Sequence, residues 1–331
     1  MTSAAVEPQV PSAVAPTLVF MFPGQSSRHP EMIEKVIRDD RESQAIVALA
    51  SDIVGRDLAT HYRACNAAMF GRNRDVQIGV FLANHLHLRR LERAGIHGDL
   101  SLGLSLGEYN HLVHIGALSF EAALRLIDER GSLYDEGPEG VMVSVFPVAP
   151  EAVEDAIDSL DVRGRAAIGL YNSPKQQVLA GERAAVEQVV AALDAEMLID
   201  AVEIESRIPM HAPTFAPVAT RFGEVLTRTQ IGAAHLPHVP NFRGVVSETA
   251  GPDEIRECLL AHVWQPVHWR ASIDAVAERA PGACFVEVGP GGVLCNLFGR
   301  GWMPGRRART DSTEAWCDYL PNLAAELCDG C

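Results

Sequence analysis

Residues 100–112, LSLGLSLGEYNHL, contain the feature that most restricts the fold of this chain, a Gly-x-Ser-x-Gly motif between an apolar run and a helical pattern. In a nucleophile elbow a strand turns sharply into a helix, and glycines two residues before and after the serine leave room for the bend. Ser105 has Gly103 and Gly107 at these positions, whereas Ser101 has Asp99 in place of the first glycine. The motif by itself also fits an ordinary glycine-rich turn, so its surroundings must decide.

The surrounding pattern favours alternating strands and helices. The apolar run at 17–22 predicts a strand buried on both faces, and residues 76–94 have apolar positions at helical spacing. A further helix is expected to begin at Ser119, a residue type that caps helices well. We therefore predict an α/β-hydrolase-like large domain with a parallel sheet, formed by residues 17–137 and 210–331.

The segment between these two parts has a different order of elements. Residues 138–209 show patterns for strand, helix, strand, strand, helix and strand in succession. This βαββαβ order is typical of a ferredoxin-like unit, so we predict an inserted ferredoxin-like small domain. A substrate cleft is expected between the two domains.

Composition narrows the class of protein. The chain has 331 residues, of which 47% are hydrophobic, and its formal charge of −15 argues against binding to nucleic acid. Residues 1–16 lack the pattern of a signal peptide and are expected to form a flexible tail, and no stretch is long enough to cross a membrane. The seven cysteines favour a reducing cytoplasm, and the sequence predicts no metal site.

A serine nucleophile needs a base, and the chain has 12 histidines. His211 lies between two prolines, just after the last predicted strand of the small domain, where the chain returns to the cleft. We expect a surface or capping role for the other candidates that occur in pairs, which are His85, His87, His235 and His238. On sequence order alone, His211 is no more than an even choice for the base.

Taken together, these motifs resemble the malonyl-CoA:acyl-carrier-protein transacylases and the acyltransferase domains of polyketide and fatty-acid synthases. The resemblance covers about 18–325 and consists of six segments in the family's order: FMFPGQSS, GLSLGEY, GALSFEAALRLIDERG, IPMHAPTF, QPVHW and FVEVGPGGVL.

The resemblance implies a catalytic dyad of Ser105 and His211. It also implies an oxyanion hole formed by the backbone N–H groups of Gln25 and Leu106. The implied reaction is a ping-pong transfer of an acyl group through Ser105, with coenzyme A or phosphopantetheine thioesters as substrates and no cofactor.

The resemblance further suggests which residues select the acyl group. Arg130 would hold the free carboxylate of a malonyl-type group, and Gln77 would help to line that pocket. The simpler alternative for Arg130 is a salt bridge at a helix end. Leu104 replaces the histidine that usually precedes the nucleophile, and Met210 precedes the catalytic histidine, so both affect acyl preference.

At position 262 this chain has a histidine where the family usually has glutamine. The family residue orients the catalytic histidine through its backbone carbonyl, and a different side chain could leave that role intact. We therefore expect His262 to orient His211.

The leading functional hypothesis is an acyltransferase that acts in trans, as a monomer, on an acyl carrier protein, with an acyl-CoA or an acyl-carrier-protein donor. The alternatives are transfer of a neutral or aminoacyl group, hydrolysis of acyl thioesters by the same fold, and a non-catalytic partner within a synthase. An acidic carrier needs a local basic surface, and the predicted docking residues are Arg300, Arg306, Arg307 and Arg309, extended by Arg207. The alternative for that cluster is a solvated loop.

Overall fold

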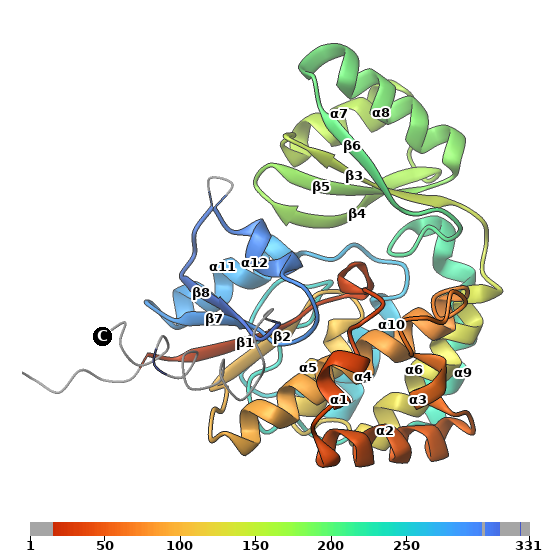
Figure 1. Cartoon of the computed structure of the whole chain (residues 1–331). Helices are drawn as coiled ribbons and strands as arrows, with labels where there is room; N and C mark the ends of the chain where they lie inside the picture. Colours follow the sequence, from red (N-terminus) through yellow and green to blue (C-terminus); the bar gives the residue numbers. More distant parts are fainter. Residues whose placement is uncertain (1–15, 300–301, 312–324, 326–331) are drawn as a thin grey trace, which may run out of the picture.

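The computed structural model describes residues 16–299, 302–311 and 325, so most of the predicted tail at 1–16 lies outside the described residues. One parallel sheet has the strand order β2-β1-β7-β8 (Figure 1). Its strands are β1 (Leu18–Phe22), β2 (Leu100–Gly103), β7 (Cys284–Glu287) and β8 (Arg306–Arg309). The strand β1 is buried nearly throughout, which explains why its sequence is apolar without alternation.

Helices from both parts of the chain surround this sheet. The longest, α4 (Asn73–Arg93), packs against α6 (Phe120–Asp135), and Ser119 caps α6 by accepting a hydrogen bond from the N–H of Ala122. The others are η1 (Gln25–Ser27), α1 (Glu34–Ile37), α2 (Arg41–Val54), α3 (Leu58–His61), α5 (Gly107–His114), η2 (Pro213–Phe215), α9 (Ala216–Arg228), α10 (Pro252–Ala261), α11 (Trp269–Arg279) and α12 (Val293–Leu297). None of the helices that the structure describes is long and apolar enough to cross a membrane.

A second sheet is antiparallel and has the order β4-β5-β3-β6. Its elements follow one another as β3 (Val141–Phe146), α7 (Pro150–Ser159), β4 (Ala166–Ser173), β5 (Gln176–Gly181), α8 (Arg183–Met197) and β6 (Asp200–Glu205). This is the ferredoxin-like arrangement, and the predicted fold class is confirmed. The last strand begins at Asp200, after Leu198 has ended α8 in a left-handed conformation with φ 54°.

The two sheets belong to units that are joined by main-chain hydrogen bonds. The two connecting segments pair through the N–H of Gly140 and the carbonyl of Arg207, at 2.9 Å. On the other side, Val267 exchanges hydrogen bonds with Gly169 and Tyr171 of β4, at 2.8 and 2.9 Å. The small sheet is therefore tied to the segment that follows α10. The domain boundaries at 138 and 209 stay predictions.

The surface or capping role predicted for three of the paired histidines is wrong. His85, His87 and His238 are 7%, 1% and 0% exposed, whereas His235 is exposed. The helix α4 is covered by other elements on nearly all sides, so its charged residues do not mark an outer face. Burial lowers the pKa of His85 and His87 to about 3 and that of His238 to about 4.

Because these buried histidines are neutral at pH 7, we expect acid to destabilise the protein. The pKa of such a histidine is lower in the folded state than in the unfolded state, where it is near 6.5. Its contribution to stability is complete above pH 6.5 and is lost as the pH falls from 6.5 toward the pKa of the folded state. Each one lowers the free energy of unfolding by up to about 1.4 kcal/mol per pH unit in that window. Glu108, whose pKa is raised to about 8, and Glu287, whose pKa is also raised by burial, act in the opposite direction, but the histidines with lowered pKa values outnumber them.

We therefore expect the urea midpoint to be clearly lower at pH 5 than at pH 7, measured by circular dichroism. An equal midpoint at the two pH values would contradict the neutral state of the buried histidines.

Candidate active site

The turn from β2 into α5 has the geometry of a nucleophile elbow. Ser105 lies in the left-handed region with φ 52°, a strained conformation for a residue with a Cβ. A Cβ on Gly103 would lie 2.0 Å from the carbonyl carbon of Gly107, and a Cβ on Gly107 would lie 2.0 Å from the oxygen of Phe22. Both glycines of the motif are therefore required by close approach of the backbone.

The hydroxyl of Ser105 meets the imidazole of His211. The distance from Ser105 Oγ to His211 Nε2 is 2.7 Å, and His211 Nδ1 lies 2.8 Å from the carbonyl oxygen of His262. A carbonyl only accepts, so Nδ1 carries the hydrogen and Nε2 is free to accept a proton from the serine. His211 itself has φ 63°, so both residues of the pair hold strained backbone.

Electrostatics keep this imidazole neutral. His211 is 1% exposed, and burial, together with the charge of Arg130, lowers its pKa to about 3, against the opposing effect of the His262 carbonyl. At pH 7 His211 therefore starts as a base rather than as an imidazolium.

Asn241 fixes the elbow from a distant part of the sequence. Its Oδ1 accepts from the N–H of Ser105 at 2.7 Å, and its Nδ2 donates to the carbonyl of Gly103 at 2.6 Å. Sequence reasoning missed this residue, because it lies in the proline-rich segment HVPNF, 136 positions from the serine, and no local pattern marks it.

A cavity opens above the serine, between the two units. It is lined by Ser105 and His211, by loop and cleft residues of the larger unit, and by residues of the small sheet. The other lining residues are Gly24, Gln25, Ser26, Leu104, Met142, Leu170, Ile204, Glu205 and Met210. Gln25, Leu104 and Met210 thus share a wall with the pair, while Leu106 directly follows the serine at the start of α5.

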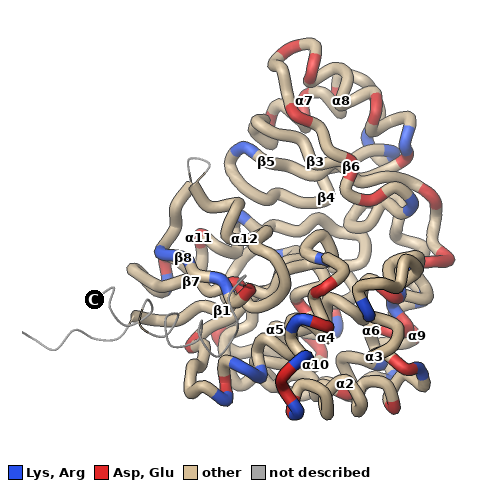
Figure 2. Tube along the Cα trace, viewed as in Figure 1, with Lys and Arg blue, Asp and Glu red and all other residues tan. Residues whose placement is uncertain are grey.

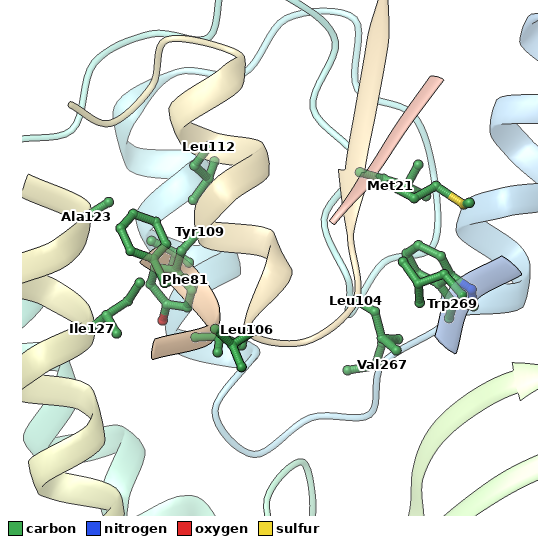
Figure 3. Close-up of a cluster of buried hydrophobic side chains, with 14 of the residues drawn as sticks. Met21, Phe81, Leu104, Leu106, Tyr109, Leu112, Ala123, Ile127, Val267 and Trp269 are labelled. Atoms are coloured by element: carbon green, nitrogen blue, oxygen red, sulfur yellow. The ribbon is translucent and has the colours of Figure 1, made fainter. Parts of the chain in front are cut away.

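The two leucines beside the nucleophile point to different neighbours. Figure 3 shows Leu104 next to Val267, whereas Leu106 lies on the other side of the elbow near Tyr109. Leu104 is 4% exposed and Leu106 1%, so both anchor the turn in the core.

Arg130 and Gln77 lie deeper and are joined to each other. Arg130 Nη1 donates to Gln77 Oε1 at 2.6 Å, and Gln77 also donates to Asn73. The guanidinium lies 4.1 Å from the ring centroid of Tyr134 and 5.3 Å from that of Tyr109. Neither Arg130 nor Gln77 is among the residues that line the cavity above Ser105, and Gln77 contacts Arg130 directly.

No ion pair accounts for this arginine among the described residues. Its side chain is 1% exposed, and its Nε and Nη2 have no hydrogen-bond partner within the described ranges. A salt bridge at a helix end, the simpler alternative for Arg130, is not what the structure shows.

The predicted docking arginines do not gather at this cavity. Arg306 begins β8, the edge strand marked blue in Figure 2, and pairs with Cys284 at the start of β7, so it lies toward the amino ends of the parallel strands. The elbow is at the carboxyl ends, where Arg309 pairs with Glu287 at the end of β7. Arg307 Nη1 donates to the carbonyls of Cys295 and Phe298, both at 2.7 Å, which is a structural role. Arg300 lies outside the described residues.

Of the predicted docking arginines, Arg207 lines a hollow next to the cavity. It is exposed, its Nη1 donates to the carbonyl of Gly71 at 3.1 Å, and it lines a hollow together with Arg28 and Glu205. Because Glu205 also lines the serine cavity, the two hollows adjoin. Arg28, three residues after Gln25, was not singled out from the sequence.

No group of three or more His, Cys, Asp or Glu within the described ranges could hold a metal ion. The arrangement can perform covalent catalysis, because it has a hydroxyl on a strained turn, a neutral base oriented by a carbonyl, and a cavity beside both.

Comparisons with known proteins agree on one family. The family model described as "Acyl transferase domain" matches residues 19–308. Malonyl CoA-acyl carrier protein transacylase of Escherichia coli (strain K12) is 30% identical over 285 residues, which are 85% of this chain and 91% of the relative. The structure of FabD from Acinetobacter baumannii is 26% identical with a TM-score of 0.85, and the match covers 95% of this chain and all of that one.

A further structure shows a type II polyketide synthase acyl-carrier protein in complex with its malonyl-transacylase. It is 26% identical, with a TM-score of 0.85, over 92% of this chain and 99% of that one. The match of the family model over most of the chain, the full-length relatives and the elbow geometry lead to one conclusion: this chain belongs to the acyl transferase domain family and is an acyltransferase.

Proposed function

We propose that this enzyme transfers a malonyl group from coenzyme A to an acyl carrier protein through an acyl-enzyme at Ser105. The observation that carries the malonyl assignment is Arg130. A buried guanidinium with no carboxylate partner in the described part of the chain is costly, and an anionic ligand offsets that cost. The names of the relatives from Escherichia coli and Bacillus subtilis support the same donor.

The carboxylate needs a path to Arg130, because Arg130 is not among the residues that line the cavity. Met142 and Met210 are in the cavity wall, and their unbranched side chains can move with little strain. Once there, the carboxylate meets Nε and Nη2, the two nitrogens to which the described residues offer no hydrogen-bond partner.

In the first half of the reaction, His211 Nε2 takes the proton of Ser105 as Oγ attacks the thioester carbonyl. The negative charge that develops on the carbonyl oxygen is stabilised by the N–H groups of Gln25 and Leu106. The tetrahedral intermediate collapses, the bond to sulfur breaks, and His211 returns the proton to the departing thiolate of coenzyme A. The malonyl group is now an ester of Ser105.

The second half runs in reverse with a new thiol. His211 removes the proton from the phosphopantetheine thiol of the carrier, the sulfur attacks the ester, and the proton returns to Ser105. One thioester replaces another, so the chemistry calls for no cofactor beyond the thioester substrates, and we propose none. The free thiols at Cys65, Cys258, Cys284 and Cys295 support a reducing compartment such as the cytoplasm.

The carrier approaches the mouth of the cavity, where Arg28 and Arg207 line the adjoining hollow. The solved complex of a carrier protein with its malonyl-transacylase supports this class of partner. Hydrolysis, the alternative outcome, places water where the carrier thiol would attack, and a clamp for the acyl carboxylate gives a hydrolase little advantage.

Incubation with radiolabelled malonyl-CoA tests the proposal. We expect label on the enzyme alone, and movement of the label to holo-acyl carrier protein when the carrier is added. Free malonate released faster than label reaches the carrier would identify a hydrolase. An enzyme that labels from acetyl-CoA but not from malonyl-CoA would assign a neutral acyl group instead.

A further inference from the structure

Glu108, in the first turn of α5, is a carboxyl group in an unusual position. It is 0% exposed, and among the residues that the structure describes no hydrogen bond of good geometry reaches either carboxyl oxygen, although the main-chain N–H of Asn241 lies nearby. A carboxylate cannot be buried in this way without a large cost, so the folded protein holds the group as the neutral acid. The proton then requires an acceptor.

His262 is the group that can provide one. It is also 0% exposed, and neither ring nitrogen has a hydrogen-bond partner within the described ranges. Its Nδ1 lies 3.6 Å from Oε2 of Glu108, which a small rotation of either side chain reduces to bonding distance. A carboxylic acid donates and a neutral imidazole nitrogen accepts, so the two groups complement each other.

The same histidine contacts the catalytic base twice. Its carbonyl oxygen accepts the hydrogen on His211 Nδ1, and its ring lies against the His211 ring with centroids 4.9 Å apart. Glu108 follows the nucleophile by three residues on the elbow helix. A bond between Glu108 and His262 would therefore connect the nucleophile's helix to the carbonyl that orients the base.

We propose that Glu108 and His262 are a pair of positioning residues, in which the acid O–H of Glu108 donates to Nδ1 of His262 and holds the His262 carbonyl in line with His211 Nδ1. The pair acts through His211 and touches no substrate. The inference uses the roles of Ser105 and His211 in the proposed function, but neither the malonyl group nor the carrier.

The surroundings of the pair make it sensitive to alkali. Burial raises the pKa of Glu108 to about 8, while the main-chain N–H of Asn241 and the charge of Arg130 act to lower it. The pKa of His262 is well below its usual value because of burial, with His211 and Arg130 adding to the effect.

Tyr109 and Cys258, the other two titratable neighbours of Glu108, stay neutral near pH 8. The pKa of Tyr109 is raised by burial, and burial and Glu108 raise the pKa of Cys258 to about 12. As the pH rises through about 8, Glu108 therefore loses its donor, and the pair separates.

The test is the pre-steady-state burst of p-nitrophenol from p-nitrophenyl acetate, which reports acylation of Ser105 without malonyl recognition. We expect the wild-type burst rate to fall as the pH rises from 7 to 9.5. Glu108→Gln keeps a donor that cannot ionise, so its rate should stay near the wild-type value at pH 7 and remain level. The control is Glu287→Gln, a buried carboxyl that instead accepts from the N–H groups of Leu294 and Cys295, and its profile should follow the wild type.

Substitutions at position 262 test the second member. His262→Ala keeps the carbonyl but loses the side chain that holds it, and we expect an acylation rate on the order of 10- to 100-fold lower with unchanged KM. His262→Gln restores a group that can accept from Glu108 and should recover most of the rate.

Either of two results overturns the proposal: a Glu108→Gln rate that declines with pH as the wild type does, or a His262→Ala burst as fast as the wild type. If His262→Ala does not fold, the two pH profiles decide. A protein that shows the burst but takes no label from malonyl-CoA contradicts the proposed donor and leaves the positioning pair intact.

Discussion

Ser105→Ala is expected to form no acyl-enzyme with any thioester donor, while its melting temperature stays close to that of the wild type. The hydroxyl is the only atom lost, and its partner His211 Nε2 faces the cavity, where water can replace it. Intact-protein mass spectrometry after incubation with malonyl-CoA measures the adduct directly.

Ser101→Ala is the matched control, because Ser101 begins an identical Ser-Leu-Gly sequence four residues before Ser105. Its hydroxyl is buried and lies 2.8 Å from His111 Nδ1 and 2.9 Å from His114 Nδ1. We expect this variant to acquire the adduct normally but to lose about 1–3 kcal/mol of stability, because polar atoms are left unsatisfied. An adduct on the Ser105→Ala protein would show that another residue is the nucleophile.

The elbow could be predicted because its requirements are local. Two glycines at fixed distances from Ser105, a preceding apolar run and a following helical pattern all appear within one short stretch. The same holds for the alternation of helices and strands in the small domain, and for the Ser119 cap. These features depend on neighbours a few residues apart, so the sequence displays them.

The contacts that complete the site are not local, and the sequence could not display them. Asn241 reaches the elbow across 136 positions, and Glu108 and His262 meet only because α10 ends beside α5. The position of the β8 arginines is a further non-local feature. It depends on the register of β8 against β7, which puts Arg306 toward the amino ends of the strands and Arg309 opposite Glu287, toward the carboxyl ends.

The sequence also gave no indication that polar side chains of α4 are buried. The helix α4 carries polar and charged residues on several sides, and periodicity therefore gave no sign that His85 and His87 lie inside. A long central helix that packs against many elements has no free face for the pattern to mark. The surroundings of Arg130 could not be predicted either. Nothing in its sequence position within α6 shows that it has no charged partner among the described residues, which only the structure reveals.

Arg130→Ala is expected to discriminate between acyl donors. The variant loses the charge-assisted hydrogen bonds to the malonyl carboxylate, worth roughly 1.5–3 kcal/mol, which corresponds to a fall of about 10- to 150-fold in kcat/KM for malonyl-CoA. Acetyl-CoA has no carboxylate to lose, so its kcat/KM should change little or rise. Rapid-quench measurement of acyl-enzyme formation from the two donors gives both values with the same protein.

The control for Arg130→Ala is Arg125→Ala, an arginine of the same helix that is exposed and pairs with Glu121 at 3.0 Å. It should leave both donors unaffected, because an exposed ion pair of this kind contributes little. Melting temperatures of the two variants separate a loss of packing against Tyr109 and Tyr134 from a loss of charge. An equal fall in kcat/KM with malonyl-CoA and acetyl-CoA would contradict the role of Arg130 in binding the acyl carboxylate. Arg130 would then be a structural residue of the core, held by Tyr109, Tyr134 and Gln77.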